Sequence, residues 1–177
     1  MVIYVSMLRG INVGGQRKVP MKELRACYES LGLSNVSTYI QSGNVMFASD
    51  EHSAPSLVGA IEAEVKERFG FTVVAVLRTE REMMKIIERN PFAKGDRDKS
   101  YVTFLSAKPS RIPIEEIDAV KAPSEEYSIS GGEVYLLLPN GYGRTKLSNS
   151  FMESKLGVSA TTRNWNTVMA LRNLAGH

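Results

Sequence analysis

Hydrophobic positions in the first half of the chain alternate between runs typical of strands and stripes typical of helices. Residues 2–8 are almost continuously apolar, as expected for a central strand covered on both faces. Apolar residues recur at helical spacing after Pro20 and again after Ser53, and Gly32 and Gly70 stand where these helices should end. The predicted strands are 2–8, 36–41, 45–49 and 73–78, and the predicted helices are 20–31 and 54–69. The order β-α-β-β-α-β is that of a split, ferredoxin-like unit.

A similar pattern starts again after residue 100. Thr79 and Glu82 fit a capping box that opens a short helix, and Asn90-Pro91 ends it. Residues 93–100 are polar and charged without periodicity, which makes them the best candidate for a linker. The later predicted elements are strands at 101–106, 127–130 and 134–138, helices at 114–120 and 147–156, and an extra C-terminal helix within 161–174.

The two predicted hairpins share a spacing. Residues 40–45 read Ile-Gln-Ser-Gly-Asn-Val and residues 129–134 read Ile-Ser-Gly-Gly-Glu-Val, with isoleucine, glycine and valine coinciding. Together with the repeated element order, this predicts an α+β protein of two related ferredoxin-like (βαββαβ) halves with an extra C-terminal helix. The expected organisation is a first half at 1–78, a connecting helix and linker at 79–100, and a second half plus helix at 101–177.

Composition places the chain among ordinary globular proteins. A 177-residue chain with 43% apolar residues can bury a core of its own, so disordered and disulfide-stapled classes are excluded. Cys27 is the only cysteine, which rules out an internal disulfide and favours a reducing compartment. No apolar run approaches the length of a membrane helix, and the first residues lack a basic segment and cleavage site. We therefore expect a cytoplasmic protein with no membrane partner.

Positive charge is concentrated at the two ends of the sequence. Residues 1–25 carry five basic groups and one acidic group, and residues 139–177 carry the same balance. The stretch between them is net acidic, which leaves a formal charge of only +3. If the fold brings the two ends together, they form one basic surface for an anionic partner. Scattered, solvated side chains are the alternative interpretation.

Few residues have the chemistry or spacing of a metal site or a catalytic triad. The two histidines, His52 and His177, have no cysteine pair or second histidine at ligand spacing, so no metal site and no cofactor are predicted. A magnesium site made of carboxylates alone is the alternative, but the carboxylates fall mostly on predicted helix surfaces, where solvated side chains are the better interpretation. No Gly-x-Ser-x-Gly elbow occurs, and Cys27 lies on an apolar helical stripe, where a small buried hydrophobe is expected. No catalytic residue and no reaction can be assigned from the sequence.

The sharpest local feature is the glycine-containing loop at 9–18, Arg-Gly-Ile-Asn-Val-Gly-Gly-Gln-Arg-Lys. It leaves a predicted strand and enters a predicted helix, a context in which backbone N–H groups bind phosphate. The spacing fits neither standard phosphate-binding template, because Gln16 stands where a P-loop has lysine. We interpret it as an unclassified anion-binding loop; a strand-to-helix connection that needs glycine at positive φ is the alternative.

Two further basic loops lie at 139–146 and 161–167. Within the last, Trp165 either packs in the core or stacks on a ring of a ligand. The predicted shared anion-binding surface combines Arg9, Arg17 and Lys18 with Arg144, Lys146 and Arg163. All candidate ligand-binding residues are Arg9, Asn12, Arg17, Lys18, Gln41, Ser42, Asn44, Arg144, Lys146, Arg163, Asn164 and Trp165.

Four blocks of sequence carry a resemblance to a known family. Residues 8–15, 39–45, 90–92 and 162–167 occur in order and closely resemble the pattern of the domain of unknown function 1697 family, mainly bacterial proteins of this size. The resemblance extends over essentially the whole chain. It implies an α+β fold with two related halves, and it implies no established activity, substrate or catalytic residue.

The sequence therefore favours a binding protein or an enzyme for a small phosphorylated or other anionic ligand, held by basic, glycine-rich loops. One alternative is a nucleic-acid-binding module that uses an open sheet face, although the aromatic strand signature of such modules is missing. Another is an interaction domain whose sheet edge pairs with a partner. Oligomeric state does not follow from the sequence.

Folding and function are expected to need no transition metal, because two isolated histidines and one cysteine cannot supply the ligands of a zinc site. Elemental analysis of the untagged protein should find no stoichiometric zinc, and a chelator should leave the unfolding midpoint unchanged. Zinc that leaves together with the folded structure would contradict this prediction.

Overall fold

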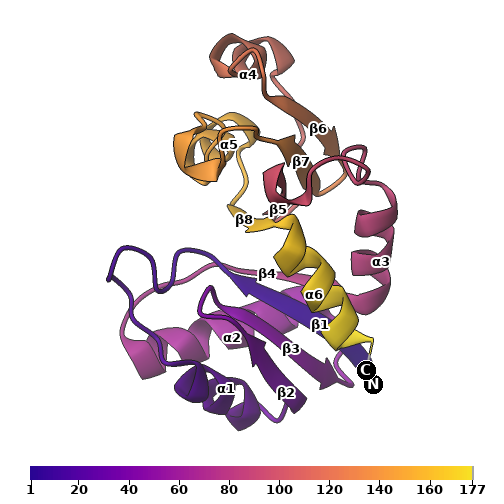
Figure 1. The fold of residues 1–177 in the computed structure, drawn as a ribbon. Coiled ribbons are helices and arrows are strands. Elements are labelled where there is room, and N and C mark those ends of the chain that lie inside the picture. Colours follow the sequence, from indigo (N-terminus) through magenta and orange to yellow (C-terminus); the bar gives the residue numbers. More distant parts are fainter. Residues whose placement is uncertain (177) are drawn as a thin grey trace. The chain divides into compact units, whose positions relative to one another are not determined.

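The computed structural model describes residues 1–176 and shows a mixed α/β protein (Figure 1). These residues form two four-stranded antiparallel sheets and six α-helices. The chain divides into two compact units. The first unit comprises Met1–Met84 together with the end of the chain from Leu171, and the second comprises Lys85–Ala170. Both covalent links between the units are helical, because the divisions fall inside the third and the sixth helix.

The first sheet is built around the first strand of the chain. That strand is antiparallel to its neighbours on both sides, and the strand order is β2-β3-β1-β4. The elements are β1 (Val2–Leu8), α1 (Met21–Ser30), β2 (Ser34–Tyr39), β3 (Asn44–Ser49), α2 (Ala54–Phe69), β4 (Ala75–Thr79) and α3 (Glu80–Glu88).

The second sheet has the order β6-β7-β5-β8, which equals the first order when each strand is replaced by the strand four places later. All its pairings are antiparallel as well. The elements are β5 (Ser100–Leu105), α4 (Ile114–Val120), β6 (Glu126–Ser130), β7 (Glu133–Leu137), α5 (Asn149–Leu156), β8 (Ala160–Asn164) and α6 (Trp165–Ala175), with short 3-10 turns at Arg97–Lys99 and Tyr142–Arg144.

Corresponding backbone contacts occur in both units. The Leu8 N–H donates to the Gly43 carbonyl at 2.9 Å, and the Leu105 N–H donates to the Gly132 carbonyl at the same distance. Each bond ties the end of a central strand to the turn of the adjacent hairpin. Val45 of β3 and Val134 of β7 therefore occupy corresponding strands, each beside the central strand of its sheet.

Each unit has an apolar core on the helix-covered face of its sheet. In the first unit, Tyr4, Phe47 and Ile61 are buried together, and the Tyr28 hydroxyl is bonded to Ser6 Oγ at 2.8 Å. The opposite face of β1 is buried too, as expected for a central strand. The core of the second unit is formed by Leu105, Ile117, Val134, Leu136, Leu138, Leu147, Met152, Leu156 and Ala160.

Local signals in the sequence set several helix ends. Ser53 Oγ accepts from the Ser56 N–H at the start of α2, and Gly70 ends the helix in the left-handed region at φ 79°. The predicted capping box is confirmed, because the Thr79 N–H donates to Glu82 Oε2 at 2.7 Å and the Glu82 N–H donates to Thr79 Oγ1 at 3.2 Å.

The predicted helix within 161–174 is wrong over its first four residues. Residues 160–164 form strand β8, which pairs with β5 along its whole length, and the helix begins only at Trp165. Adjacent threonines favour a strand, and Thr161 and Arg163 are buried at a period of two. The C-terminal helix is also not an addition to one half, because α6 follows β8 as α3 follows β4.

The predicted linker at 93–100 is partly ordered into regular elements. A 3-10 turn occupies Arg97–Lys99, where Asp96 Oδ1 accepts from the Asp98 N–H, and β5 starts at Ser100. Among the described residues, no helix is both long enough and apolar enough to cross a membrane.

Gly43→Ala is expected to lower the free energy of unfolding by about 2–4 kcal/mol. Gly43 has φ +79°, and an added Cβ would lie 2.8 Å from Ile11 Cδ1, so the substitution adds backbone strain and a steric clash. Urea denaturation of the variant and the wild type measures the effect.

Gly59→Ala is the matched control for this substitution. Gly59 lies inside α2, and no atom would come within 4 Å of a Cβ added there, so alanine should stabilise the protein by roughly 0.5–1 kcal/mol. A Gly43→Ala protein as stable as the wild type would show that β1 and the hairpin turn do not approach each other closely.

Candidate anion-binding site

The glycine-containing loop between β1 and α1 is a small hairpin of its own. The Asn12 N–H donates to the Arg17 carbonyl at 3.1 Å, and the Gln16 N–H donates to the Val13 carbonyl at 3.0 Å. Gly14 and Gly15 form the two-residue turn with φ values of 58° and 75°. Two successive positive φ angles are the geometry of a type I′ turn, which explains the Gly-Gly pair.

Asn12 fixes this loop to the rest of the first unit. Its Nδ2 donates to the Val19 carbonyl at 3.0 Å and to the Gln41 carbonyl at 2.9 Å, and its Oδ1 accepts from the Val19 N–H at 2.8 Å. The amide group is thus engaged by the protein on both its nitrogen and its oxygen. Asn12, which the sequence places among ligand-binding residues, positions the loop against the β2–β3 turn.

A surface hollow of about 450 Å³ lies beside the loop. Lys18 and Gln41 are exposed at its rim, and Pro20 contributes the start of α1. Pro20 is the N-cap residue of α1 and provides no side-chain hydrogen bond, so the first turn of this ten-residue helix has no side-chain cap. The lining residues are Asn12, Gly15, Lys18, Val19, Pro20 and Gln41.

Two cations of the loop have no acidic partner; Lys18 lines the hollow, whereas Arg17 is not among its lining residues. Within residues 1–176, neither Arg17 nor Lys18 forms an ion pair. The Arg17 guanidinium lies 5.6 Å from the centre of the Phe71 ring, a cation–π distance. Phe71 is not among the sequence candidates, because it stands far along the chain from the loop and no motif marks it. Arg9 is half-buried, and its N–H donates to the Val74 carbonyl at 2.9 Å.

Backbone strain is concentrated at the same place. Four non-glycine residues of the described chain have positive φ, and three of them, Asn12, Arg17 and Ile40, lie in this loop or in the adjacent β2–β3 turn. Ile40 is β-branched and has φ 49°, a conformation that such residues rarely adopt. Strained backbone persists where the surroundings impose it, and it is frequent at binding sites.

The remaining first-unit candidates hold the β2–β3 turn. Asn44 is fully buried, and its Nδ2 donates to the Tyr39 carbonyl at 3.1 Å and to Ser42 Oγ at 2.7 Å. Gln41 is exposed at the hollow, whereas its carbonyl accepts from Asn12. The structure therefore brings Asn12, Lys18 and Gln41 to one hollow and gives Ser42 and Asn44 a role in the turn.

Arg144 and Lys146 belong to a different loop of the fold. Both are exposed in the segment that follows β7 and leads to α5, whereas the glycine loop follows the central strand β1. In the second unit, the segment that corresponds to the glycine loop is 106–112, between β5 and α4. The shared surface predicted for cations of both units stays a prediction.

Arg163 is buried within β8. Its Nη1 donates to Thr161 Oγ1 at 2.6 Å and to the Thr162 carbonyl at 3.0 Å, and burial lowers the pKa of the guanidinium to about 10. Arg78 occupies the corresponding position of β4 and donates to the Leu77 carbonyl at 2.8 Å. The arginine is therefore a repeated feature of the fourth strand rather than a feature of one basic loop.

Asn164 and Trp165 form the start of α6. Asn164 Oδ1 accepts from the Thr167 N–H at 2.8 Å, which is an N-cap bond. The Trp165 side chain is only 2% exposed. Of the two interpretations of this tryptophan, packing fits its burial, since stacking on a ligand needs an exposed ring face.

The described residues contain no group of three or more histidine, cysteine or acidic side chains that could hold a metal ion. His52 is exposed, and His177 lies outside the described residues. Burial raises the pKa of the Cys27 thiol to about 11, so the thiol is protonated at neutral pH and is a poor nucleophile.

Asn12→Gly is expected to lower the free energy of unfolding by about 1–3 kcal/mol and to accelerate hydrogen exchange of the Val19 amide. Glycine tolerates the φ of 54°, so the loss reports the three side-chain hydrogen bonds. Asn35→Gly is the control, because Asn35 has φ 52° and is exposed, and this variant should be as stable as the wild type or slightly more stable. Equal effects of the two substitutions would refute the positioning role of Asn12.

Comparison with known proteins supports the fold and the family. The conserved bacterial protein SP0830 from Streptococcus pneumoniae has a similar solved structure, with a TM-score of 0.75 and 24% sequence identity over 98% of both chains. No curated protein matches the sequence. Residues 1–135 match the family model described as protein of unknown function (DUF1697), and three of the four motifs noted above lie inside that stretch. The chain therefore belongs to the DUF1697 family.

Proposed function

We propose that this protein binds a small phosphorylated or other anionic ligand at the hollow beside the glycine-containing loop of the first unit. The ligand's negative charge would face Lys18 and Arg17, and the loop would supply backbone N–H groups. Asn12 holds the loop in place without contacting the ligand.

The observation that carries this proposal is a comparison of corresponding connections in the two units. The chain enters α1 through Val19-Pro20 and α4 through Ile112-Pro113, and in both helices the proline carbonyl accepts from the N–H four residues later, that of Leu24 or Ile117. The second unit reaches this junction with 106–112 alone, whereas the first unit uses 9–19. The longer loop is thus not needed to close the connection, which favours a binding role.

The properties of the hollow favour a small anion. Its volume of about 450 Å³ is within the range of small-molecule sites, roughly 300–1,000 Å³. Arg17 and Lys18 have no ion-pair partner within residues 1–176, so binding an anion breaks no ion pair of theirs. Glycines at the turn let a ligand approach backbone donors closely.

Binding of nucleic acid on the open sheet face is the less favoured function. Tyr4 and Phe47, the aromatic residues of β1 and β3, are 3% and 1% exposed. Their rings stack on each other at 5.5 Å within the core. Neither ring is available to a base, as sheet-based recognition of single strands requires.

We also propose that the two units are ferredoxin-like halves related by duplication. The repeated element order and strand order support this. So does a repeated side-chain contact: Glu62 of α2 accepts from the Ala75 N–H at 3.0 Å, and Glu153 of α5 accepts from the Ala160 N–H at 3.1 Å. In each unit a helix carboxylate thus holds the first residue of the fourth strand. We propose the boundaries 1–78 and 101–177 for the two halves. A cytoplasmic location is a separate proposal.

Calorimetric titration of the untagged chain with inorganic phosphate, AMP and ATP tests the ligand proposal. At least one of these anions should bind. Lys18→Ala and Arg17→Ala should each weaken that binding by about ten- to a hundredfold, since a hydrogen bond to a charged group contributes ~1.5–3 kcal/mol.

Lys108→Ala is the matched control, because Lys108 is exposed in the corresponding connection of the second unit. The Lys108→Ala protein should bind the anion with the same affinity as the wild type. Equal weakening by Lys108→Ala would show that net charge alone drives binding, and the absence of binding by all three anions would refute the proposal. A single-stranded oligonucleotide that binds with a steep salt dependence would favour the nucleic-acid function instead.

A further inference from the structure

We infer that the second unit binds an extended, basic peptide segment, which adds a strand to the edge of β6 beneath helix α4. The peptide carries an aliphatic side chain and, two residues away, a lysine or arginine. This inference is independent of the anion site, which lies in the first unit.

β6 is an edge strand with free pairing capacity. Within the described residues it pairs with β7 alone, and it stands at the end of the strand order β6-β7-β5-β8. In an antiparallel pair, alternate residues direct their N–H and C=O groups away from the partner strand. None of the residues of β6, Glu126–Ser130, is proline, so an added strand can form main-chain hydrogen bonds along the edge.

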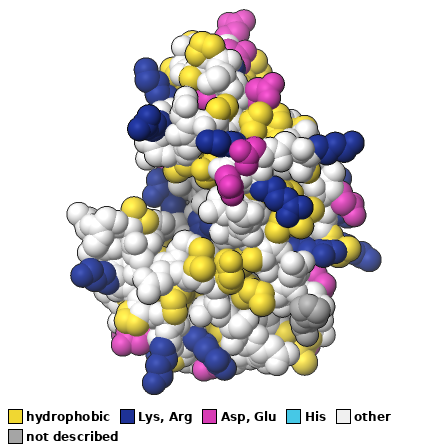
Figure 2. Space-filling view, viewed as in Figure 1, with side chains coloured by type: hydrophobic (Ala, Val, Ile, Leu, Met, Phe, Trp, Pro, Cys, Tyr) yellow, Lys and Arg dark blue, Asp and Glu magenta, His cyan; other side chains and the backbone are white. Residues whose placement is uncertain are grey.

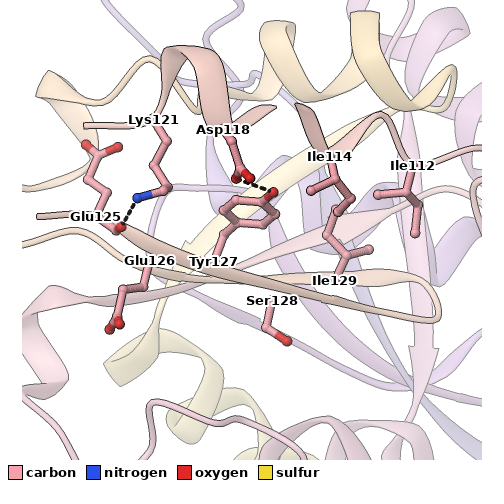
Figure 3. Close-up of a pocket in the computed structure, with 9 residues that line it drawn as sticks. All are labelled: Ile112, Ile114, Asp118, Lys121, Glu125, Glu126, Tyr127, Ser128 and Ile129. Atoms are coloured by element: carbon pink, nitrogen blue, oxygen red, sulfur yellow. Dashed lines mark hydrogen bonds between the residues drawn. The ribbon is translucent and has the colours of Figure 1, made fainter. Parts of the chain in front are cut away.

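A hollow of about 470 Å³ lies between this strand and α4. Figure 3 shows Ile114 of the helix above Ile129 of the strand, with Ile112 beside them. Ile112 and Ile114 are 40% and 48% exposed, which is unusual for isoleucine. The three side chains form an apolar end of the groove that an aliphatic side chain of the peptide would cover.

The other end of the groove is acidic. Asp118 accepts from the Tyr127 hydroxyl at 2.8 Å, and both side chains are drawn together in Figure 3. The Lys121 ammonium is held by backbone carbonyls, among them that of Glu125 at 2.8 Å. Of the lining carboxylates, that of Asp118 faces the groove beside Tyr127. Glu126 points to the other face of the strand with Ser128, and Glu125 is buried, its carboxylate accepting from Thr145 Oγ1 at 3.0 Å. In the space-filling view, carboxylates also lie beside apolar atoms at the top, where Figure 1 places α4 (Figure 2). This charge selects a basic partner.

The spacing of the strand sets the pattern of the peptide. Tyr127 and Ile129 both face α4, since residues two apart lie on one face of a sheet, and Figure 3 shows Ser128 pointing the other way. On an added strand, two peptide side chains that face α4 and are two residues apart lie beside Tyr127 and Ile129. The aliphatic one therefore packs against Ile129 and Ile114, and the basic one extends over Tyr127 toward the Asp118 carboxylate.

Fluorescence anisotropy with short labelled peptides tests the inference on the full chain. The probes are Thr-Ile-Thr-Arg-Thr and Thr-Arg-Thr-Ile-Thr, which cover both strand directions, and the same peptides with glutamate in place of arginine. One arginine peptide should bind about tenfold or more tightly than its glutamate counterpart at low salt. Backbone N-methylation of its alternate residues should abolish binding, and amide shift changes in the protein should map to β6 and α4.

Variants of the groove make the test specific. Ile114→Ser should weaken binding by about tenfold, and Asp118→Asn should remove the preference for arginine while keeping a partner for the Tyr127 hydroxyl. Leu174→Ser is the control, because Leu174 is 45% exposed on α6, outside the groove. The inference would be overturned if neither arginine peptide binds the folded protein, or if Ile114→Ser leaves the affinity for the peptide unchanged. A dimer that Ile114→Ser dissociates would assign the groove to a second copy of the chain and overturn it as well.

Discussion

The candidate anion site depends on the close approach of the end of β1 to the turn between β2 and β3. The Leu8 N–H donates to the Gly43 carbonyl, and Ile11 fills the space that a side chain at residue 43 would need. Because the turn is held there, the Gln41 carbonyl is within reach of Asn12, and the loop carries Lys18 to the rim of the hollow. The Leu105–Gly132 bond repeats the constraint in the second unit without a glycine loop, so the constraint belongs to the fold and the loop is an addition to it.

Much of the fold could be predicted because its signals are local. The capping box at Thr79 and the left-handed glycine at Gly70 depend only on neighbouring residues, and apolar periodicity located β1 from Val2 to Leu8. Strand β8 could not be predicted in the same way, because the threonines at its centre are compatible with helix-capping positions as well as with a strand. Pairing with β5 decides between them, and such pairing joins residues about sixty positions apart in the sequence.

The candidate site was predictable as a location but not residue by residue. Glycine and basic residues marked the loop in the sequence, because glycine tolerates positive φ and because lysine and arginine carry the charge that an anionic ligand would need. Net charge could not separate Lys18, which is exposed at the hollow, from Arg163, which is buried in a strand. That distinction depends on strand register. Arg163 pairs with Val102 of β5, and its side chain lies on the other face of the sheet from that of its neighbour Thr162. Asn12 and Asn44 have the polarity of ligand-binding residues. Their side-chain amides, however, form hydrogen bonds with backbone groups of their own unit.

The two units carry different charges at corresponding exposed positions. Helices α1 and α4 both begin after a proline N-cap, but Lys22 follows one start where Glu115 follows the other. Residues on the exposed first turn of a helix contribute little to the core, so they can change charge at little cost in stability. The connections before these helices tolerate different lengths for the same reason. The two units thus differ in charge at exposed positions, while both have an apolar core and the same strand order.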